Sequence, residues 1–146
     1  MGYGSRRILG SEGSTAQIQQ LPGSIGYLEY AFSVQNQIQV ATLENKSGRF
    51  VEPTINSFTQ ALNNTTLPDN LRVFITDPVG ADSYPIVAYT WLLVYKKYDD
   101  PDKAATLKYL LNWSLTEGQR FASPLGYVPL PPRVIRIVRE KVNQTL

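Results

Sequence analysis

Residues 10–15 are the sequence's candidate for anion binding, because glycine and hydroxyl residues gather there at a predicted helix start. Two glycines and three hydroxyl residues lie just before or at the start of a predicted helix, and Arg6 lies shortly before them. Free backbone N–H groups at a helix start attract anions, and a nearby guanidinium strengthens the attraction. The candidate ligands are Arg7, Ser11, Gly13, Ser14 and Thr15. The glycine spacing does not match that of a P-loop. Plain capping of the helix by Gly13 or Ser14 is therefore the alternative interpretation.

Other side chains offer little catalytic or metal-binding chemistry. Histidine and cysteine are both absent, which removes disulfides, zinc–thiolate sites and the usual nucleophile–base pairs. An enzyme is therefore not expected. Five aspartates fall in predicted loops, and their spacing matches no EF-hand: Asp77, Asp82, Asp99, Asp100 and Asp102. Loop aspartates usually cap turns and helices, so we predict neither a metal nor a cofactor.

Basic and aromatic side chains supply two further candidate surfaces. A stripe of cations on the last predicted helix comprises Arg133, Arg136, Arg139 and Lys141. It could dock on an acidic partner, or it could be the solvated face of an amphipathic helix. The net charge of +2 is too small to indicate nucleic acid or an anionic membrane as a partner. Trp91 and Trp113 are predicted to fill the core rather than to contact a ligand.

The elements that would position these side chains are organised around residues 84–96. Apolar, β-branched and aromatic residues follow one another here without alternating with polar residues. This pattern is typical of a strand that is covered on both faces. Pro85 is tolerated at the entrance of such a strand. A helix of similar length is the alternative interpretation.

Helices and further strands are predicted on both sides of this stretch, which indicates an α/β fold. The predicted helices cover residues 14–21, 31–36, 53–63, 100–115 and 132–143. The predicted extended segments cover residues 25–30, 37–43, 49–51 and 71–75. A turn at residues 45–48 would join two of them into a hairpin. On the short helix, Phe32 and Val34 are expected to point inward.

Three stretches, taken together, resemble one protein family. They are residues 10–13 with LPGSIGYLEYA at 21–31, SYPI at 83–86 with the strand after it, and LNWSLTEGQ at 111–119 with LGYVPLP at 125–131. Their order and spacing resemble the C-terminal half of the phosphate-binding protein of bacterial ABC phosphate transporters. The resemblance runs from about Gly10 to Val142.

This resemblance implies a two-lobed, type 2 periplasmic-binding-protein fold, in which a mixed sheet is flanked by helices. Residues 1–13 would be a loose lead-in, residues 14–36 the end of lobe two and the crossover, and residues 37–146 the C-terminal share of lobe one. It also implies a periplasmic or extracytoplasmic location and the membrane subunits of the transporter as partners. No signal-peptide pattern is visible in the first ten residues.

The family's phosphate ligands belong to motifs that would lie upstream of this sequence, so none transfers to a residue here. Two hypotheses follow. The chain is a phosphate-binding subunit, or a fragment of one, that binds phosphate only with its missing half. Alternatively, it is a ligand-free interaction or structural domain that associates with itself or with another chain, because its sheet would lack strands and expose apolar surface.

Overall fold

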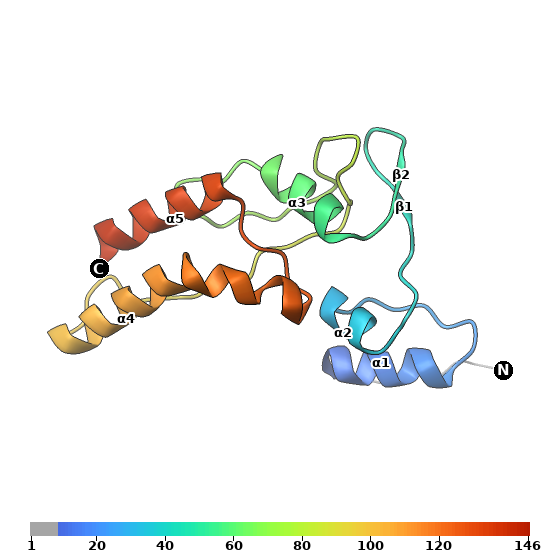
Figure 1. Cartoon of the computed structure of the whole chain (residues 1–146), viewed down its shortest axis with the longest axis horizontal. Coiled ribbons are helices and arrows are strands. Elements are labelled where there is room, and N and C mark those ends of the chain that lie inside the picture. Colours follow the sequence, from blue (N-terminus) through green and yellow to red (C-terminus); the bar gives the residue numbers. More distant parts are fainter. Residues whose placement is uncertain (1–8) are drawn as a thin grey trace.

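The structure is a computed structural model that describes residues 9–146, and within them helices predominate (Figure 1). In chain order the elements are α1 (Gly10–Gln20), α2 (Tyr30–Gln35), β1 (Leu43–Glu44), β2 (Phe50–Val51), α3 (Ile55–Asn63), α4 (Pro101–Ser114), the 3₁₀ helices η1 (Glu117–Phe121) and η2 (Ser123–Leu125), and α5 (Pro132–Thr145). Helices α1 and α2 pack together at one end, and α4 and α5 pack together at the other. In Figure 1 the hairpin lies above the α1–α2 pair, and α3 lies between the hairpin and α5.

All five predicted helices are present, and side-chain caps explain where α3 and α4 begin. The Asp100 carboxylate accepts hydrogen bonds from the backbone N–H groups of Asp102 (2.9 Å) and Lys103 (3.2 Å), and Pro101 follows as the first residue of α4. In α3, Thr54 and Ser57 form a reciprocal capping box. Helix α1 begins earlier than predicted, at Gly10, and has no side-chain cap.

The predicted hairpin is confirmed, although each strand is only two residues long. Strands β1 and β2 pair antiparallel, with Leu43 opposite Val51 and Glu44 opposite Phe50. This pair is the whole sheet within the described residues. The Asn45 N–H donates to the Arg49 carbonyl at 2.8 Å and closes the turn.

The best-packed core is a small aromatic cluster against α3. The Phe58 ring lies edge-to-face between Tyr30, at a centroid distance of 4.9 Å, and Tyr84, at 5.3 Å. Val51 from β2 completes the buried cluster. Phe58 and Leu62 are buried as the spacing on this helix predicts, so α3 connects the hairpin, α2 and the start of the long extended segment.

The predicted central strand at residues 84–96 is wrong in this structure. The segment is a plain tube in Figure 1 and has no ladder partner among the described residues. Ile86 is 71% exposed and Leu93 is 97% exposed. A strand needs neighbouring strands as hydrogen-bond partners for its backbone N–H and C=O groups, and no strand lies beside these residues in the described part of the chain. For the same reason residues 71–75 and 25–30 are not strands, and the predicted mixed sheet does not form here.

Two further burial predictions are also wrong. Trp91 is 40% exposed and Trp113 is 39% exposed, because the sheet that would have covered them is not formed. On α2 the buried side chains are Ala31 and Ser33 rather than Phe32 and Val34. Small residues face inward there because the turn at Gly126 approaches α2 closely. No helix within residues 9–146 is both long enough and apolar enough to span a bilayer.

Candidate functional site

The predicted anion site lies at the first turns of α1, apart from Arg7, which is outside the described residues. Gly10 adopts a left-handed φ of 70°, and Leu9 before it offers no capping side chain. A Cβ placed on Gly10 would lie 2.9 Å from the Glu12 Oε2 atom. A carboxylate therefore already lies against this helix start, where it satisfies the helix dipole and would repel an incoming anion.

The three hydroxyl groups of this segment do not share a hydrogen-bond partner. Ser14 Oγ donates to the Gly10 carbonyl at 3.2 Å. Ser11 Oγ accepts a long hydrogen bond of 3.4 Å from the Glu29 N–H and so links α1 to the start of α2. Thr15 is buried, and its Oγ1 has no hydrogen-bond partner among the described residues. Gly13 lies one turn into the helix. The described candidates therefore do not surround one point.

The charged candidates are dispersed as well. Asp100 caps α4, Asp77 Oδ1 accepts from the Lys46 N–H at 2.9 Å, and Asp82 pairs with Arg49. No group of three or more potential metal-ligating His, Cys, Asp or Glu side chains occurs within residues 9–146. The four cations of the α5 stripe are all exposed. One of them, Arg133, donates to the Thr65 carbonyl at 3.4 Å.

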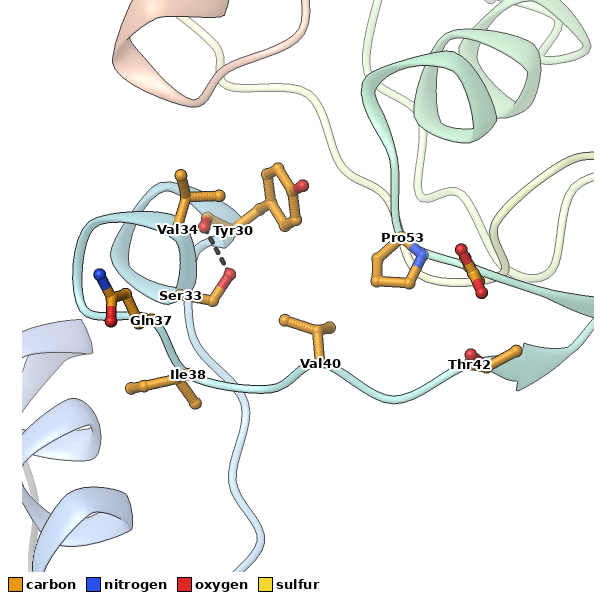
Figure 2. A pocket seen from close by; sticks show the side chains of 9 residues that line it. Tyr30, Ser33, Val34, Gln37, Ile38, Val40, Thr42 and Pro53 are labelled. Carbon is orange, nitrogen blue, oxygen red and sulfur yellow. Dashed lines mark hydrogen bonds between the residues drawn. The ribbon is translucent and has the colours of Figure 1, made fainter.

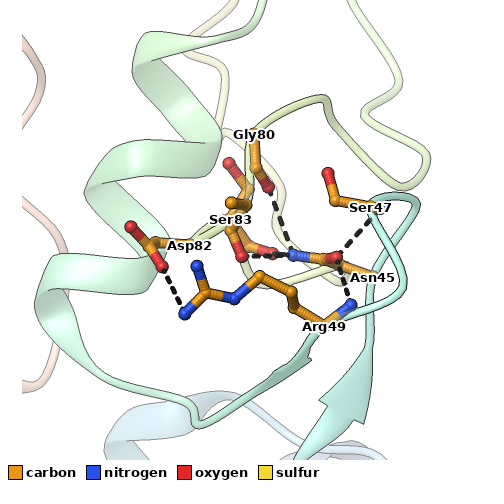
Figure 3. A network of polar contacts seen from close by, with 7 residues as sticks. Asn45, Ser47, Arg49, Gly80, Asp82 and Ser83 are labelled. Atoms are coloured by element: carbon orange, nitrogen blue, oxygen red, sulfur yellow. Dashed lines mark hydrogen bonds and ion pairs between the residues drawn. The ribbon is translucent and has the colours of Figure 1, made fainter.

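Figure 3 shows the densest polar network, which is centred on the buried side chain of Asn45. Its Nδ2 donates to the carbonyls of Gly80 (3.2 Å), Ala81 (2.9 Å) and Ser83 (3.1 Å). Its Oδ1 accepts backbone N–H groups from the hairpin turn. Every polar atom of this amide is used, so the network fastens a loop and has no free group for a ligand.

A hollow of about 410 Å³ lies between α2, residues 37–42 and residues 52–53, as Figure 2 shows. Ser33 Oγ at its edge donates to the Tyr30 carbonyl at 2.7 Å. Glu52 is the only charged side chain among the residues that line it. A carboxylate in the wall makes this hollow unsuitable for an anion such as phosphate.

An apolar groove of about 300 Å³ separates α4 and α5 from residues 89–94. The Tyr89 hydroxyl donates to the Leu62 carbonyl at 3.4 Å, and the Trp91 Nε1–H donates to the Leu71 carbonyl at 2.9 Å. Burial raises the pKa of the Tyr89 phenol, and nearby Arg133 partly opposes that rise. The groove is lined mainly by leucine, valine and aromatic side chains, so it suits apolar groups rather than an anion.

Comparison with known proteins assigns the family. Residues 4–117 match the family described as PBP superfamily domain. The chain belongs to the PBP superfamily. A protein named phosphate-binding protein PstS from Haemophilus influenzae (strain KW20 / Rd) is 33% identical over 134 residues, which are 90% of this chain and 40% of that protein. Proteins of the same name from Xylella fastidiosa (strain 9a5c) and Methanocaldococcus jannaschii are 36% and 35% identical, over 87% and 92% of this chain.

The match confirms the resemblance to phosphate-binding proteins that the sequence motifs indicate. The relatives are named as binding proteins rather than as enzymes. The chain spans about 35–40% of the length of these relatives. As a PBP superfamily member it is expected to have an α/β fold, and the structure contributes helices and one small sheet to that fold.

Sequence reasoning missed the Asn45 network and the close approach of Gly126 to α2. Gly126 has a φ of 80°, and a Cβ on it would lie 2.6 Å from the Ala31 Cα. The Tyr127 hydroxyl next to it donates to Glu29 Oε2 at 2.8 Å. An Asn at the start of a turn was a usable signal for the first feature. Nothing local indicated the second feature, because it joins distant parts of the chain; Tyr127 and Glu29, for example, are 98 residues apart.

Proposed function

We propose that this chain is part of the phosphate-binding subunit of an ABC phosphate importer, and that it binds phosphate only together with a further segment. The observation that carries this proposal is the match to several proteins named phosphate-binding protein, which extends over 87–92% of the chain. Periplasmic location and the importer's membrane subunits as partners are part of the same proposal.

The need for a further segment is supported by the geometry of the anion candidates. Recognition of a phosphate dianion requires several donors that enclose it, because a charge that loses water without compensating hydrogen bonds is costly. The hydroxyls of Ser11 and Ser14 bond to separate backbone groups, and Glu12 adds a negative charge beside the start of α1. Most of the length of each relative lies outside the match, which leaves room for ligand residues elsewhere.

The proposal includes the finer features of the fold. In the assembled protein, residues 71–75 and 86–94 would be strands of a mixed sheet in a type 2 arrangement. Residues 14–36 would be the end of lobe two and the crossover, and residues 37–146 would be a share of lobe one. The separation of the α1–α2 pair from α4 and α5 supports this division.

Titration calorimetry at low salt tests the proposal. The chain alone should bind inorganic phosphate more weakly than a dissociation constant of about 1 μM, which corresponds to about −8 kcal/mol. Adding the part of the Haemophilus relative that lies outside the match should produce phosphate binding, with sulfate as the control anion. Tight binding by the chain alone, or no binding by the mixture, would contradict the proposal.

A second candidate function is a ligand-free interaction domain. The specific observation in its favour is the exposed apolar segment at residues 86–94, where Leu92 is 73% exposed and Leu93 is 97% exposed. Surfaces of this kind mark sites where another chain associates. Mass in solution separates the candidates, because a stable homodimer would favour the interaction domain over a subunit that needs its missing half.

A further inference from the structure

The linker at residues 36–42 joins α2 to β1 and has few contacts with the rest of the chain. Ile38 is half-buried, and the other side chains of the linker are all exposed. The hollow of Figure 2 runs along the linker, and Val40, which is 41% exposed, points into that hollow. Side-chain packing therefore does little to fix the linker.

A single long-range hydrogen bond holds this linker. The Tyr84 hydroxyl donates to the Ala41 carbonyl at 2.9 Å and so joins residues that are 43 positions apart in the sequence. Within residues 9–146, no other group beyond α2 forms a hydrogen bond with residues 37–41. The position of the linker thus depends on one side chain from a distant part of the chain.

Tyr84 is itself firmly placed. It is 6% exposed, its N–H donates to the Ser57 carbonyl at 3.2 Å, and its ring packs edge-to-face against Phe58. Ser83 before it is fully buried, and the Ser83 carbonyl accepts a hydrogen bond from Asn45. Burial also raises the pKa of the Tyr84 phenol, so the hydroxyl keeps its proton and remains a donor.

A second tyrosine hydroxyl holds the other end of α2. The Tyr127 hydroxyl donates to Glu29 Oε2 at 2.8 Å, just before the helix begins. Residues 29–41 are therefore attached to the rest of the chain by a tyrosine at each end. Tyr127 is 49% exposed, so water competes for its hydrogen bond, whereas Tyr84 is buried. The bond from Tyr84 is the better shielded of the two.

We propose that the Tyr84 hydroxyl is a positioning group for phosphate binding. By holding Ala41 it fixes the linker, and the linker fixes the α1–α2 pair relative to residues 43–146. This inference rests on the proposed function, which assigns the pair and the remainder to different lobes. Small-ligand sites occur preferentially between domains, and a dianion needs donors that enclose it. The orientation of the lobes then decides whether those donors reach the anion together.

The first test measures this orientation in the chain alone. Tyr84→Phe keeps the ring and removes only the hydroxyl. Spin labels on Ala16→Cys in α1 and Asn143→Cys in α5, both exposed positions in a chain without cysteine, report the distance between the two ends. Tyr84→Phe should broaden the distance distribution measured by pulsed electron paramagnetic resonance. An unchanged distribution would overturn the proposal.

Tyr89→Phe is the matched control for this variant. It also removes a hydroxyl that donates to a backbone carbonyl, but the acceptor is Leu62 in α3 rather than the linker. It should therefore leave the distance distribution unchanged. Equal broadening by Tyr84→Phe and Tyr89→Phe would contradict a role that is specific to the linker.

The second test measures phosphate binding by calorimetry, in the mixture of this chain with the part of the Haemophilus relative that lies outside the match. Tyr84→Phe should raise the dissociation constant by about two- to tenfold at unchanged stoichiometry. Losing one hydrogen bond changes an equilibrium by about this factor, and only the fraction of molecules in the correct orientation binds. Tyr89→Phe should leave the dissociation constant unchanged.

Stoichiometry separates positioning from plain structural support. If Tyr84 only stabilised the fold, Tyr84→Phe would lower the number of binding sites and leave the dissociation constant unchanged, and that result would overturn the proposal. No binding by the unchanged mixture would instead contradict the proposed function, and the role in phosphate binding would fall with it. The label distances do not depend on phosphate, so the two failures are distinguishable.

Discussion

At the scale of single residues, Asn45 has the most consequential hydrogen bonds. It is 4% exposed and joins the hairpin turn to the loop at residues 80–83, where Ser83 is fully buried. Gly80 in that loop has a φ of 118°, and a Cβ there would lie 2.4 Å from Asn64 Nδ2. The hydrogen bonds of Asn45 and the absence of a Cβ at Gly80 therefore both help the loop at residues 80–83 to pack against its neighbours.

We expect Asn45→Ala to destabilise the chain by about 3 kcal/mol. The change removes five hydrogen bonds, of which one is buried and four are part-buried. A buried group that is left without a partner costs about 1–3 kcal/mol. Urea unfolding followed by circular dichroism measures the effect. Asn143→Ala, at an exposed position near the end of α5, is the control and should change stability by less than about 0.5 kcal/mol. Equal effects would show that the network does not stabilise the fold.

Tyr127 gives a prediction that depends on pH. The Glu29 carboxylate accepts the hydrogen bond of the phenol and raises its pKa above the ordinary value of 10.0. Because this pKa is raised, the stabilisation that the Tyr127–Glu29 hydrogen bond gives to the folded state is fully present below pH 10. It is lost as the pH rises through the folded-state pKa of the phenol.

The melting temperature of Tyr127→Phe should therefore be lower than that of the unchanged chain at pH 8, and the difference should shrink above pH 10. Tyr27→Phe, at a position that is 94% exposed, controls for the general effect of alkaline pH. A difference that stays constant across this range would show that the phenol–carboxylate bond is not its source.

At the scale of elements, the five helices and the short hairpin were predictable, and the longer strands were not. Asp100 and Pro101 begin α4 as their types predict, because caps act through bonds within a few residues. The apolar run at residues 84–96 also has the composition of a strand, but a strand forms only where partners lie alongside it. Local chemistry therefore predicted the helices, and the missing partners made the strand prediction fail.

The end of α2 provides a prediction at this scale. Gln37 adopts a left-handed φ of 54°, and the Ile38 N–H donates back to the Ser33 carbonyl at 2.9 Å. This is the Schellman arrangement, which favours glycine at the left-handed position. Gln37→Gly should raise the free energy of unfolding by about 0.5–1 kcal/mol, because a side chain in this conformation costs about 1–2 kcal/mol.

Gln35→Gly is the matched comparison, since the same replacement is made two residues earlier, inside α2. It should lower the free energy of unfolding by about 1 kcal/mol, because glycine is a poor helix former. Thermal and urea unfolding report both changes. The same sign for the two variants would exclude the Schellman interpretation.

At the scale of the whole molecule, two packed ends are joined by a few contacts. The α1–α2 pair contacts the rest through the Tyr30–Phe58 ring pair and through the turn at Gly126. The order of the sequence motifs identified the family, but not this arrangement. Its contacts join residues far apart in the chain, and no local pattern records such a contact.

Gly126→Ala should release the α1–α2 pair while the α3 cluster stays folded. The new Cβ would lie 2.6 Å from the Ala31 Cα, and the residue would also keep a left-handed φ of 80°. Overpacking against backbone and the strained φ together should cost about 2–4 kcal/mol. Hydrogen exchange measured by mass spectrometry should then be at least about tenfold faster in α1 and α2, with Phe58 and its neighbours still protected.

Gly23→Ala separates the strained φ from the collision with Ala31. Gly23 has a similar φ of 76°, but a Cβ there meets nothing within 4 Å, so this variant carries the backbone strain without the collision. Gly23 also lies between α1 and α2, so strain alone would act on the same pair of helices. If Gly23→Ala accelerates exchange in the pair as much as Gly126→Ala does, the contact between Gly126 and Ala31 is not what holds the two ends together. If only Gly126→Ala does so, the packing of one turn against α2 fixes how the α1–α2 pair sits on the rest of the chain.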